Sequence, residues 1–457
     1  MTFESLPNDV LLAIFNFYLA LLHVAFASRT RWHTLVHVCQ RWRYLVFASP
    51  GHLNLRLHCT IETPVKEMLD IWPPLPIVIT DRSDSMSGVD NIITALKQHD
   101  RVRQIILDVI PGWKMDTFVP AMLEPFPVLE TITLAASEHD SAMAVVPDSF
   151  LGGSAPQLQW LSLCDVSFPA LPNFLSSTKN LVDLELSGIP RSGYISPEVM
   201  VTFLSAMPRL EAFLFRFHSP QSFPNDESHH HPPLARSTLP ALSELAFDGV
   251  WEYFEEFIAR IDVPVIRILE ITFFHRYFYD FLQLSQFLDH LEIFKSQTHA
   301  HMDLFHGGAK VSLPLSGTYP DPNLSLGISC IELDLQLRYL AQVCSSSLLP
   351  FHKVKILEIS STYEMWQSDR DDLRWLDILQ PFSDVERLYI AENILTPVTY
   401  TLKMAAERRI TEVLPAIQEL SVGEHLPSGS VLRAIENFAT SRRLFTRLDG
   451  PNRWVAS

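Results

Sequence analysis

The sequence has few of the residues on which nucleic-acid binders and disulfide frameworks depend. It holds 35 Lys and Arg against 52 Asp and Glu, a formal net charge of −17. A protein that binds duplex nucleic acid needs a basic surface to displace counterions, so this balance argues against that class. The five cysteines are widely spaced and no C-x-x-C occurs, which argues against a disulfide framework or a structural zinc site. We expect a reducing compartment, cytoplasmic or nuclear.

Sequence motifs of common enzymes are also missing. There is no G-x-S-x-G, H-E-x-x-H, P-loop or G-x-G-x-x-G, so we expect no enzymatic activity, no catalytic residue and no cofactor. Residues 229–231 are three histidines inside the Pro- and Ser-rich segment 219–238. No carboxylate or Cys stands beside them at ligand spacing, so a surface loop is preferred to a metal site.

Long apolar runs are rare, and the longest one lies near the N-terminus. Residues 10–27 are almost all apolar, but Glu4 and Asp9 precede them and no Lys or Arg does. A signal peptide has a positive first region, and a membrane span is longer and less interrupted. We therefore favour a buried helix over a targeting or anchoring segment, and we expect no membrane partner.

The chain is too long for one core, and a repeating pattern fills most of it. At 457 residues and 47% apolar, it exceeds the size at which a single core stops growing, about 250–300 residues. The pattern apolar-x-x-apolar-x-apolar recurs twelve times, with starts 22 to 40 residues apart. The copies begin at Val102, Leu129, Leu158, Leu181, Leu210, Leu242, Ile266, Leu288, Ile328, Val354, Val385 and Ile417.

A short strand every 20–30 residues, separated by a helix-sized gap, is typical of leucine-rich repeats. One unit cannot bury its own apolar face, and stacking many units makes a continuous core. The alternative is a chance pattern in an apolar chain, and the copies at Leu288 and Ile328 are the weakest. The asparagine that usually follows the strand is missing, so we predict an irregular solenoid.

Residues 4–48 have helical rather than strand periodicity. Ser5 is a candidate N-cap and Pro7 falls in the first turn, both favourable at a helix start. A second helical stretch runs through residues 32–47, and the Ser-Pro-Gly sequence at 49–51 ends it.

This N-terminal part resembles an F-box. Residues 6–15 read LPNDVLLAIF, similar to the first F-box helix, and residues 38–43 read VCQRWR, similar to its Val-Cys-basic-Trp helix. The Ala-Ser-Pro sequence at 48–50 matches the turn that follows. With the repeats, and with residues 65–79 and 102–113, the chain is similar over nearly its full length to a large fungal group of F-box proteins with leucine-rich repeats.

The resemblance implies a role in ubiquitination. F-box proteins are substrate receptors of SCF-type cullin-RING ligases, in which the F-box docks on a Skp-type adaptor, and through it a cullin, while the C-terminal domain selects a protein substrate. By matching position, the adaptor-binding residues would be Leu6, Pro7, Val10, Leu11, Ile14 and Trp42. Exposed apolar residues on a small helical unit are consistent with a partner surface; the alternative is that some of them, Trp42 especially, are the unit's own core.

The chain departs from the F-box pattern between the two helices. Family members usually carry a polar connection there, whereas residues 21–27 are apolar. An extended first helix or a local insertion would alter the docking geometry, and a non-functional F-box is the second interpretation.

The positions that adjoin the apolar sites of each repeat are expected to form the concave surface, because strand residues alternate between two faces. Eleven of these 36 positions are acidic and only Arg216 and Arg387 are basic. The sequence therefore suggests a negative face that attracts a basic segment of a substrate; the alternative is that the acids only provide solubility. Asp183 and Glu185 could resemble a catalytic acid/base pair, but two solvated carboxylates are the preferred interpretation. The candidate substrate-binding residues are Asp183, Glu185, Glu244, Asp248, Glu270, Glu332 and Asp334.

Together these patterns predict an α/β fold. We expect a helical F-box over residues 1–60, a connecting segment at 61–98 and a tail at 441–457. Between them, residues 99–440 are expected to form an irregular leucine-rich repeat solenoid, a curved parallel sheet with outer helices and a loop at 219–238. The predicted function is a substrate receptor of an SCF-type ligase. The alternatives are a repeat protein that binds a partner without ubiquitin transfer, and an enzyme or membrane-associated protein.

Overall fold

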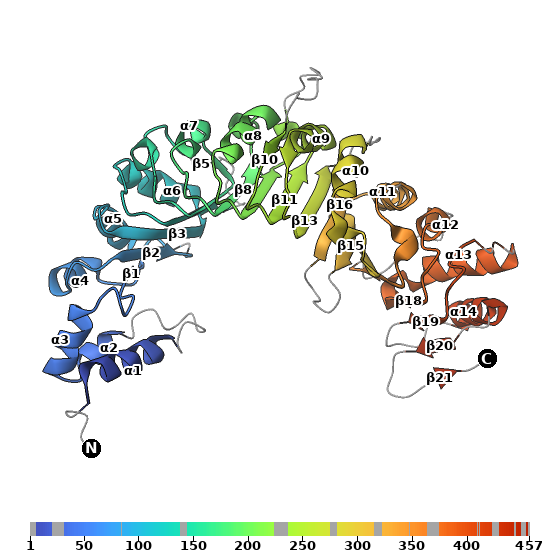
Figure 1. Ribbon diagram of the computed structural model, residues 1–457, viewed down its shortest axis with the longest axis horizontal. Helices are drawn as coiled ribbons and strands as arrows, with labels where there is room; N and C mark the ends of the chain where they lie inside the picture. Colours follow the sequence, from blue (N-terminus) through green and yellow to red (C-terminus); the bar gives the residue numbers. More distant parts are fainter. Residues whose placement is uncertain are drawn as a thin grey trace. The chain divides into compact units, whose positions relative to one another are not determined.

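The computed structural model describes most of the chain: residues 6–20, 32–83, 85–137, 144–223, 236–274, 281–314, 322–346, 348–362, 374–408, 410, 412–422, 429–442, 445–448 and 454–455. The chain forms two compact units, one of residues 1–194 with 206–210 and one of residues 195–205 with 211–457. Both units contain helices and a mostly parallel sheet (Figure 1).

The first unit begins with three helices and continues into a sheet. Its helices are α1 (Asn8–Ala20), α2 (Trp32–Val36), α3 (Gln40–Ala48), α4 (Val65–Ile71), α5 (Val89–Leu96), α6 (Gly112–Phe118) and α7 (Leu171–Leu175). Its strands are β1 (Leu57–Cys59), β2 (Ile77–Asp81), β3 (Val102–Ile110), β4 (Thr131–Ala136), β5 (Ala144–Val145), β6 (Trp160–Cys164), β7 (Val166–Ser167) and β8 (Asp183–Ile189).

The main sheet of the first unit is parallel throughout, in the order β1-β2-β3-β4-β6-β8. The apolar repeat positions lie in register across it. One row of fully buried side chains runs Ile105, Ile132, Leu161, Leu184 from β3 to β8. Each strand alone buries only a few apolar residues, so the core depends on stacking, as in a solenoid. Residues 61–98, expected to be a connection, carry α4, β2 and α5, and the sheet already begins at β1.

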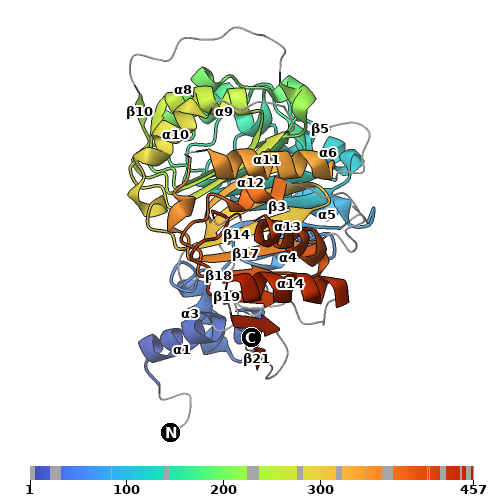
Figure 2. The ribbon, with the colours of Figure 1, turned by 90° about the vertical axis from the view of Figure 1, so that its right-hand side faces the viewer.

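The second unit repeats the arrangement. Its helices are α8 (Pro197–Ser205), α9 (Trp251–Ala259), α10 (Leu282–Asp289), α11 (Leu333–Ser345), α12 (Arg374–Leu379), α13 (Leu395–Glu407) and α14 (Gly429–Arg442). Its strands are β9 (Ala212–Phe217), β10 (Ser237–Thr238), β11 (Glu244–Gly249), β12 (Ile261–Asp262), β13 (Ile268–Phe274), β14 (His299–Phe305), β15 (Gly308–Pro314), β16 (Pro322–Ser329), β17 (Ile356–Ser361), β18 (Arg387–Ile390), β19 (Glu419–Val422), β20 (Phe445–Leu448) and β21 (Trp454–Val455). Helices α9 to α14 follow one another along one side of the strands (Figure 2).

Ten of the twelve predicted repeat strands are present, and the two weakest are wrong. Leu288 belongs to α10, and the two later members of that copy lie around a short 3-10 helix, Glu292–Phe294. In the copy at Ile328, only the first residue is in a strand, β16; Ile331 is 69% exposed and Leu333 begins α11. Three apolar residues at this spacing also arise in helices and strand ends, which is why the pattern misled here.

An antiparallel insertion accounts for the stretched interval. The strands of the second unit follow the order β9-β11-β13-β16-β15-β14-β17-β18-β19-β20-β21. β15 pairs antiparallel with both β14 and β16, while β16 and β14 pair in parallel with the regular strands β13 and β17. The meander therefore fills the sheet between two repeats without interrupting it.

Backbone hydrogen bonds link consecutive repeats at the residues just before their strands. The amide of Glu130 donates to the carbonyl of Arg103, Gln159 to Glu130, and Val182 to Gln159, each at 2.8 Å. No particular side chain is needed at these positions, because the backbone itself supplies the donor and the acceptor.

Among the described helices, none is long and apolar enough to cross a membrane.

Candidate functional site

Helix α1 is anchored against α3 by one of its faces. Leu11 and Phe15 are fully buried, and the Phe15 ring lies 4.7 Å from that of Trp42 between centroids. Arg41 on α3 donates to the carbonyl of Leu6 at 2.5 Å and to Asn8 Oδ1 at 2.7 Å. These contacts hold the start of α1 in one orientation.

The side of α1 next to this buried face carries a row of exposed apolar side chains. Val10 is 42% exposed, Ile14 43% and Phe17 66%. Their spacing of four and three residues places them on one side of a helix. We call these three residues the α1 row.

The six residues expected at an adaptor surface occupy different environments. Val10 and Ile14 lie in the α1 row and Pro7 is exposed, whereas Leu6 and Trp42 are half-buried and Leu11 is in the core. Leu11 can therefore support such a surface only by holding the helix. Phe17 was missed, although its helical spacing from Ile14 was a visible signal. The apolar segment 21–27 lies outside the described residues.

An aromatic cluster around Trp72 joins the N-terminal helices to α4. The Trp72 ring stacks on His33 at 4.8 Å between centroids and meets Trp32 edge-on at 5.2 Å. The indole of Trp32 also donates to the carbonyl of Arg56 at 3.0 Å. Burial, with a smaller effect of His37, lowers the pKa of His33, so the cluster favours a neutral imidazole.

The strand residues that alternate with the buried apolar ones form the second candidate surface, which we call the outer strand face. In the first unit it includes Asp183 and Glu185, both half-buried on β8. Glu185 accepts hydrogen bonds from Ser162 at 2.9 Å and from Ser187 at 3.2 Å. In register beside Asp183 lies Trp160, which is 45% exposed. The two hydroxyl donors hold the Glu185 carboxylate in place on this face.

In the second unit the outer strand face includes Glu244, Asp248 and Glu270, on β11 and β13. Arg216 on β9 lies 3.3 Å from the Asp248 carboxylate. Burial raises the pKa of Asp248, against the opposing effects of Arg216 and a hydrogen bond from Thr272. The face is thus less negative than its acid count suggested, because this acid has a cation beside it.

The strand placement of Glu332 and Asp334 is wrong. Both are exposed, but Glu332 precedes α11 and Asp334 lies in its first turn. The error follows from the false repeat at Ile328. Acidic residues at a helix N-terminus interact favourably with the helix dipole, which gives these two side chains a local structural role.

The meander adds a polar cluster that the sequence pattern missed. His301 on β14 contacts Ser360 on β17 with 2.9 Å between Nε2 and Oγ, and the Ser360 hydroxyl donates to Asp303 Oδ1 at 2.9 Å. In a nucleophilic triad the histidine lies between serine and carboxylate; here the serine lies between them. Burial lowers the pKa of His301, and the negative charges of Asp303 and Glu358 oppose this shift. The arrangement ties β14 to β17 and lacks the serine–histidine–carboxylate order that would activate Ser360.

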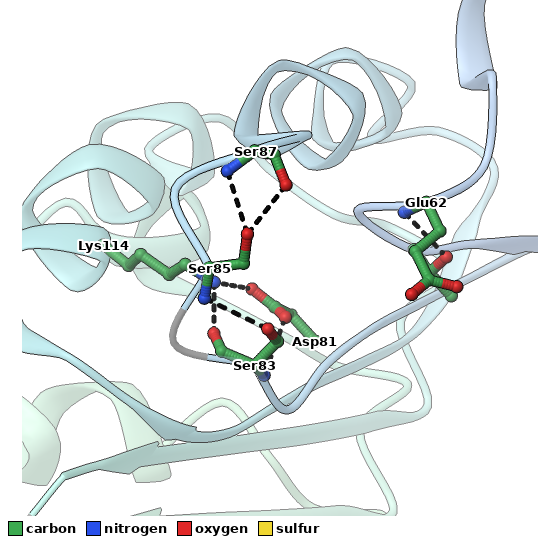
Figure 3. Close-up of polar contacts among 7 residues, drawn as sticks. Glu62, Asp81, Ser83, Ser85, Ser87 and Lys114 are labelled. Carbon is green, nitrogen blue, oxygen red and sulfur yellow. Dashed lines mark hydrogen bonds and ion pairs between the residues drawn. The ribbon is translucent and has the colours of Figure 1, made fainter.

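A buried ion pair lies at the end of β2 (Figure 3). Lys114 Nζ on α6 is 2.7 Å from Asp81 Oδ2, and both side chains are fully buried. Lys114 also donates to the carbonyl of Ser83. Asp81 Oδ1 accepts from the amide of Ser83 at 3.1 Å, and Ser85 and Ser87 share a hydrogen bond at 2.7 Å. Since Lys114 and Asp81 have no access to solvent, this pair fixes a loop and offers nothing to a ligand.

The described residues give little evidence of a metal site or of a reactive cysteine thiol. Among them, no group of three His, Cys, Asp or Glu is arranged to hold a metal ion, and residues 229–231 lie outside this part of the chain. Burial raises the pKa of Cys59 to about 12 and also raises that of Cys344. A thiol with so high a pKa is a poor nucleophile at neutral pH.

Comparison with known proteins yields a weak likeness. The crystal structure of the leucine-rich repeat-containing protein LegL7 from Legionella pneumophila matches with a TM-score of 0.28 and 16% sequence identity, over 70% of this chain and 94% of that one. No family model matches the chain. No curated protein matches it either. The repeat architecture therefore rests on the chain's own registered strands.

Proposed function

We propose that the chain is a substrate-recognition subunit of an SCF-type ubiquitin ligase, in which helices α1–α3 bind a Skp-type adaptor and the outer strand face binds a protein substrate. The observation that carries the proposal is the α1 row, an exposed apolar stripe on a helix whose adjacent face is already buried. No enzymatic step by this chain is part of the proposal.

The α1 row gains free energy when a partner removes its side chains from water. Fully burying an exposed aliphatic or aromatic side chain contributes about 1.5–3 kcal/mol, and the α1 row, 42–66% exposed, can gain roughly half of that per residue. Three such residues on one small unit are therefore a substantial driving force for association, and contiguous exposed apolar surface of this kind marks partner sites. The resemblance of residues 6–15 and 38–43 to an F-box selects the Skp-type adaptor among possible partners.

The repeats support the second half of the proposal. Within each unit, the registered repeat strands hold their outer side chains at the regular strand spacing, about 4.8 Å. Repeat proteins use such extended surfaces for binding. The outer strand face combines fixed carboxylates such as Glu185 with the exposed Trp160, a composition suited to a protein partner rather than to nucleic acid.

A second candidate is a repeat protein that binds its partner without an adaptor. The observation that favours it is the apolar sequence of residues 21–27, where F-box proteins usually have a polar connection. The two candidates differ only in whether the N-terminal helices bind a Skp-type adaptor.

Calorimetric titration of the full chain with purified Skp-type adaptor tests the proposal. We expect saturable binding that the double variant Val10→Asp/Ile14→Asp weakens at least about 30-fold, because two carboxylates would be buried without partners. Leu282→Asp is the matched control, since Leu282 is an exposed apolar residue on α10 of the second unit; it should bind like the wild type. If the adaptor does not bind the folded wild-type chain, or if Val10→Asp/Ile14→Asp binds equally well, the proposal is wrong and the second candidate remains.

A further inference from the structure

Trp160 is an unusual residue for the position it holds. It is the first residue of β6 and 45% exposed, while the next residue, Leu161, is fully buried on the opposite face. Large aromatic side chains are costly to leave in water and are over-represented among the residues that dominate protein–protein binding energy. The indole therefore marks one point of the outer strand face as a contact site.

The neighbours of Trp160 on both sides are polar. In register on β4 is Thr131 and on β8 is Asp183, with adjacent strands about 4.8 Å apart. One step along the same face, Glu185 pairs in register with Ser162 and accepts its hydrogen bond. Trp160 thus has an acidic residue in register beside it, with a second acidic residue two positions further along β8.

The charges around this point favour a cation. The outer-face positions of β4, β6 and β8 hold two carboxylates and neither Lys nor Arg; these positions are Thr131, Thr133, Ala135, Trp160, Ser162, Cys164, Asp183, Glu185 and Ser187. Two basic residues on this side of the sheet already have acidic partners: Arg103 on β3, the strand next to β4, lies 3.1 Å from Glu130, and Arg82, directly after β2, lies 3.2 Å from Asp108.

We infer that Trp160 and Asp183 form a subsite for an arginine side chain of the bound protein partner, an inference that rests on the proposed substrate-binding role of this face. A guanidinium stacks on an indole through cation–π attraction while its edge donates to a neighbouring carboxylate. Arginine fits better than lysine because its planar group does both at once, whereas an ammonium is a compact, strongly hydrated charge. Glu185 adds long-range attraction without needing to move.

Binding of a defined basic peptide to the full chain tests the subsite. The probe is fluorescein-labelled nona-arginine at about 0.15 M salt, where distant charges are screened, with nona-lysine and nona-glutamate as comparison peptides. We expect Trp160→Ala to weaken nona-arginine binding about tenfold and Asp183→Asn several-fold, and Trp160→Phe to retain part of the affinity. Nona-lysine should bind more weakly than nona-arginine, and the Trp160 indole N–H signal in an NMR titration should shift with nona-arginine.

Two matched variants separate the subsite from general attraction to an acidic chain. Trp113→Ala removes another partly exposed indole, on α6, and Glu198→Gln removes an exposed charge on α8, away from the outer strand face; both should bind nona-arginine within about twofold of the wild type. If Trp160→Ala and Asp183→Asn bind equally well, or if the controls lose as much, the inference is wrong.

Adaptor binding by the same variants distinguishes the two proposals. Trp160→Ala and Asp183→Asn should bind a Skp-type adaptor like the wild type, since neither residue lies on α1–α3. Loss of peptide binding with intact adaptor binding supports both proposals. Loss of peptide binding in a chain that never binds the adaptor keeps the subsite and overturns the ligase role.

Discussion

At the scale of single residues, the buried pair of Lys114 and Asp81 is the most consequential interaction. Desolvating two charges costs several kcal/mol per ion, and their attraction offsets this only when the remaining polar atoms are also satisfied. Here Asp81 bridges Lys114 and the amide of Ser83, and Lys114 also donates to the carbonyl of Ser83. The pair therefore connects the end of β2 to α6 and shapes the loop between β2 and α5.

Removing one partner of the pair should be far more damaging than removing a surface pair. Lys114→Met leaves the Asp81 carboxylate buried and unpaired, so we expect the free energy of unfolding to fall by about 3–5 kcal/mol. Arg82→Met breaks the exposed pair with Asp108 and should cost about 0–1 kcal/mol. Urea denaturation of both variants measures the difference.

A compensating variant checks that the penalty comes from the orphaned charge. The double substitution Asp81→Leu/Lys114→Met removes both charges and should recover a large part of the loss. Equal urea midpoints for Lys114→Met and Arg82→Met would contradict the account of this pair.

At the scale of elements, the aromatic cluster around Trp72 links helix α2 to α4 and carries a pH dependence. Burial lowers the pKa of His33 in the folded state below its ordinary value of 6.5. The unfolded chain then binds more protons than the folded one as pH falls through 6.5. The stabilisation is therefore complete above pH 6.5 and is lost as the pH falls below it.

We expect the denaturation midpoint of the wild type to fall between pH 7.5 and pH 5.5, and that of His33→Gln to fall less. His301 shifts in the same direction through burial, so a residual pH dependence should remain in the variant. His290→Gln, which replaces an exposed histidine, is the matched control and should keep the wild-type pH dependence. An identical fall for the wild type and His33→Gln would show that this imidazole does not contribute.

The elements also show how far sequence alone reaches. A local apolar triplet found ten repeat strands, because in each of them the second and third positions are buried in register with the neighbouring strand. It failed at Leu288 and Ile328, because helices and strand ends meet the same three-position rule. The alternating runs on either side of residues 306–308 were the missed signal, since two period-2 segments joined by a short Gly-containing turn predict a hairpin.

The candidate surfaces were predictable to different degrees. Helical spacing placed Val10 and Ile14 on one face and would also have placed Phe17. Trp160 was not singled out, because its exposure depends on which face of β6 the sheet buries, and that is set by the neighbouring strands. The neutralisation of Asp248 by Arg216 was likewise invisible, since it depends on cross-strand register.

At the scale of the whole molecule, the chain combines two kinds of surface in separate segments. Helices α1–α3 present an apolar row on a short helical segment, and the repeat strands present a polar face with an exposed indole. Apolar burial supplies most of the affinity in stable association, while charges steer encounter and select partners. This division would suit a receptor that binds one constant partner through its apolar row. The polar face would then select a second partner by that partner's amino-acid sequence.

The most direct test of this account is the mass of the species formed when the full chain and a Skp-type adaptor are mixed at micromolar concentration and separated by size-exclusion chromatography with light scattering. The account predicts a single peak with the summed mass of one chain and one adaptor, and two separate peaks for Val10→Asp/Ile14→Asp. Separate elution of the folded wild-type chain and the adaptor would contradict it.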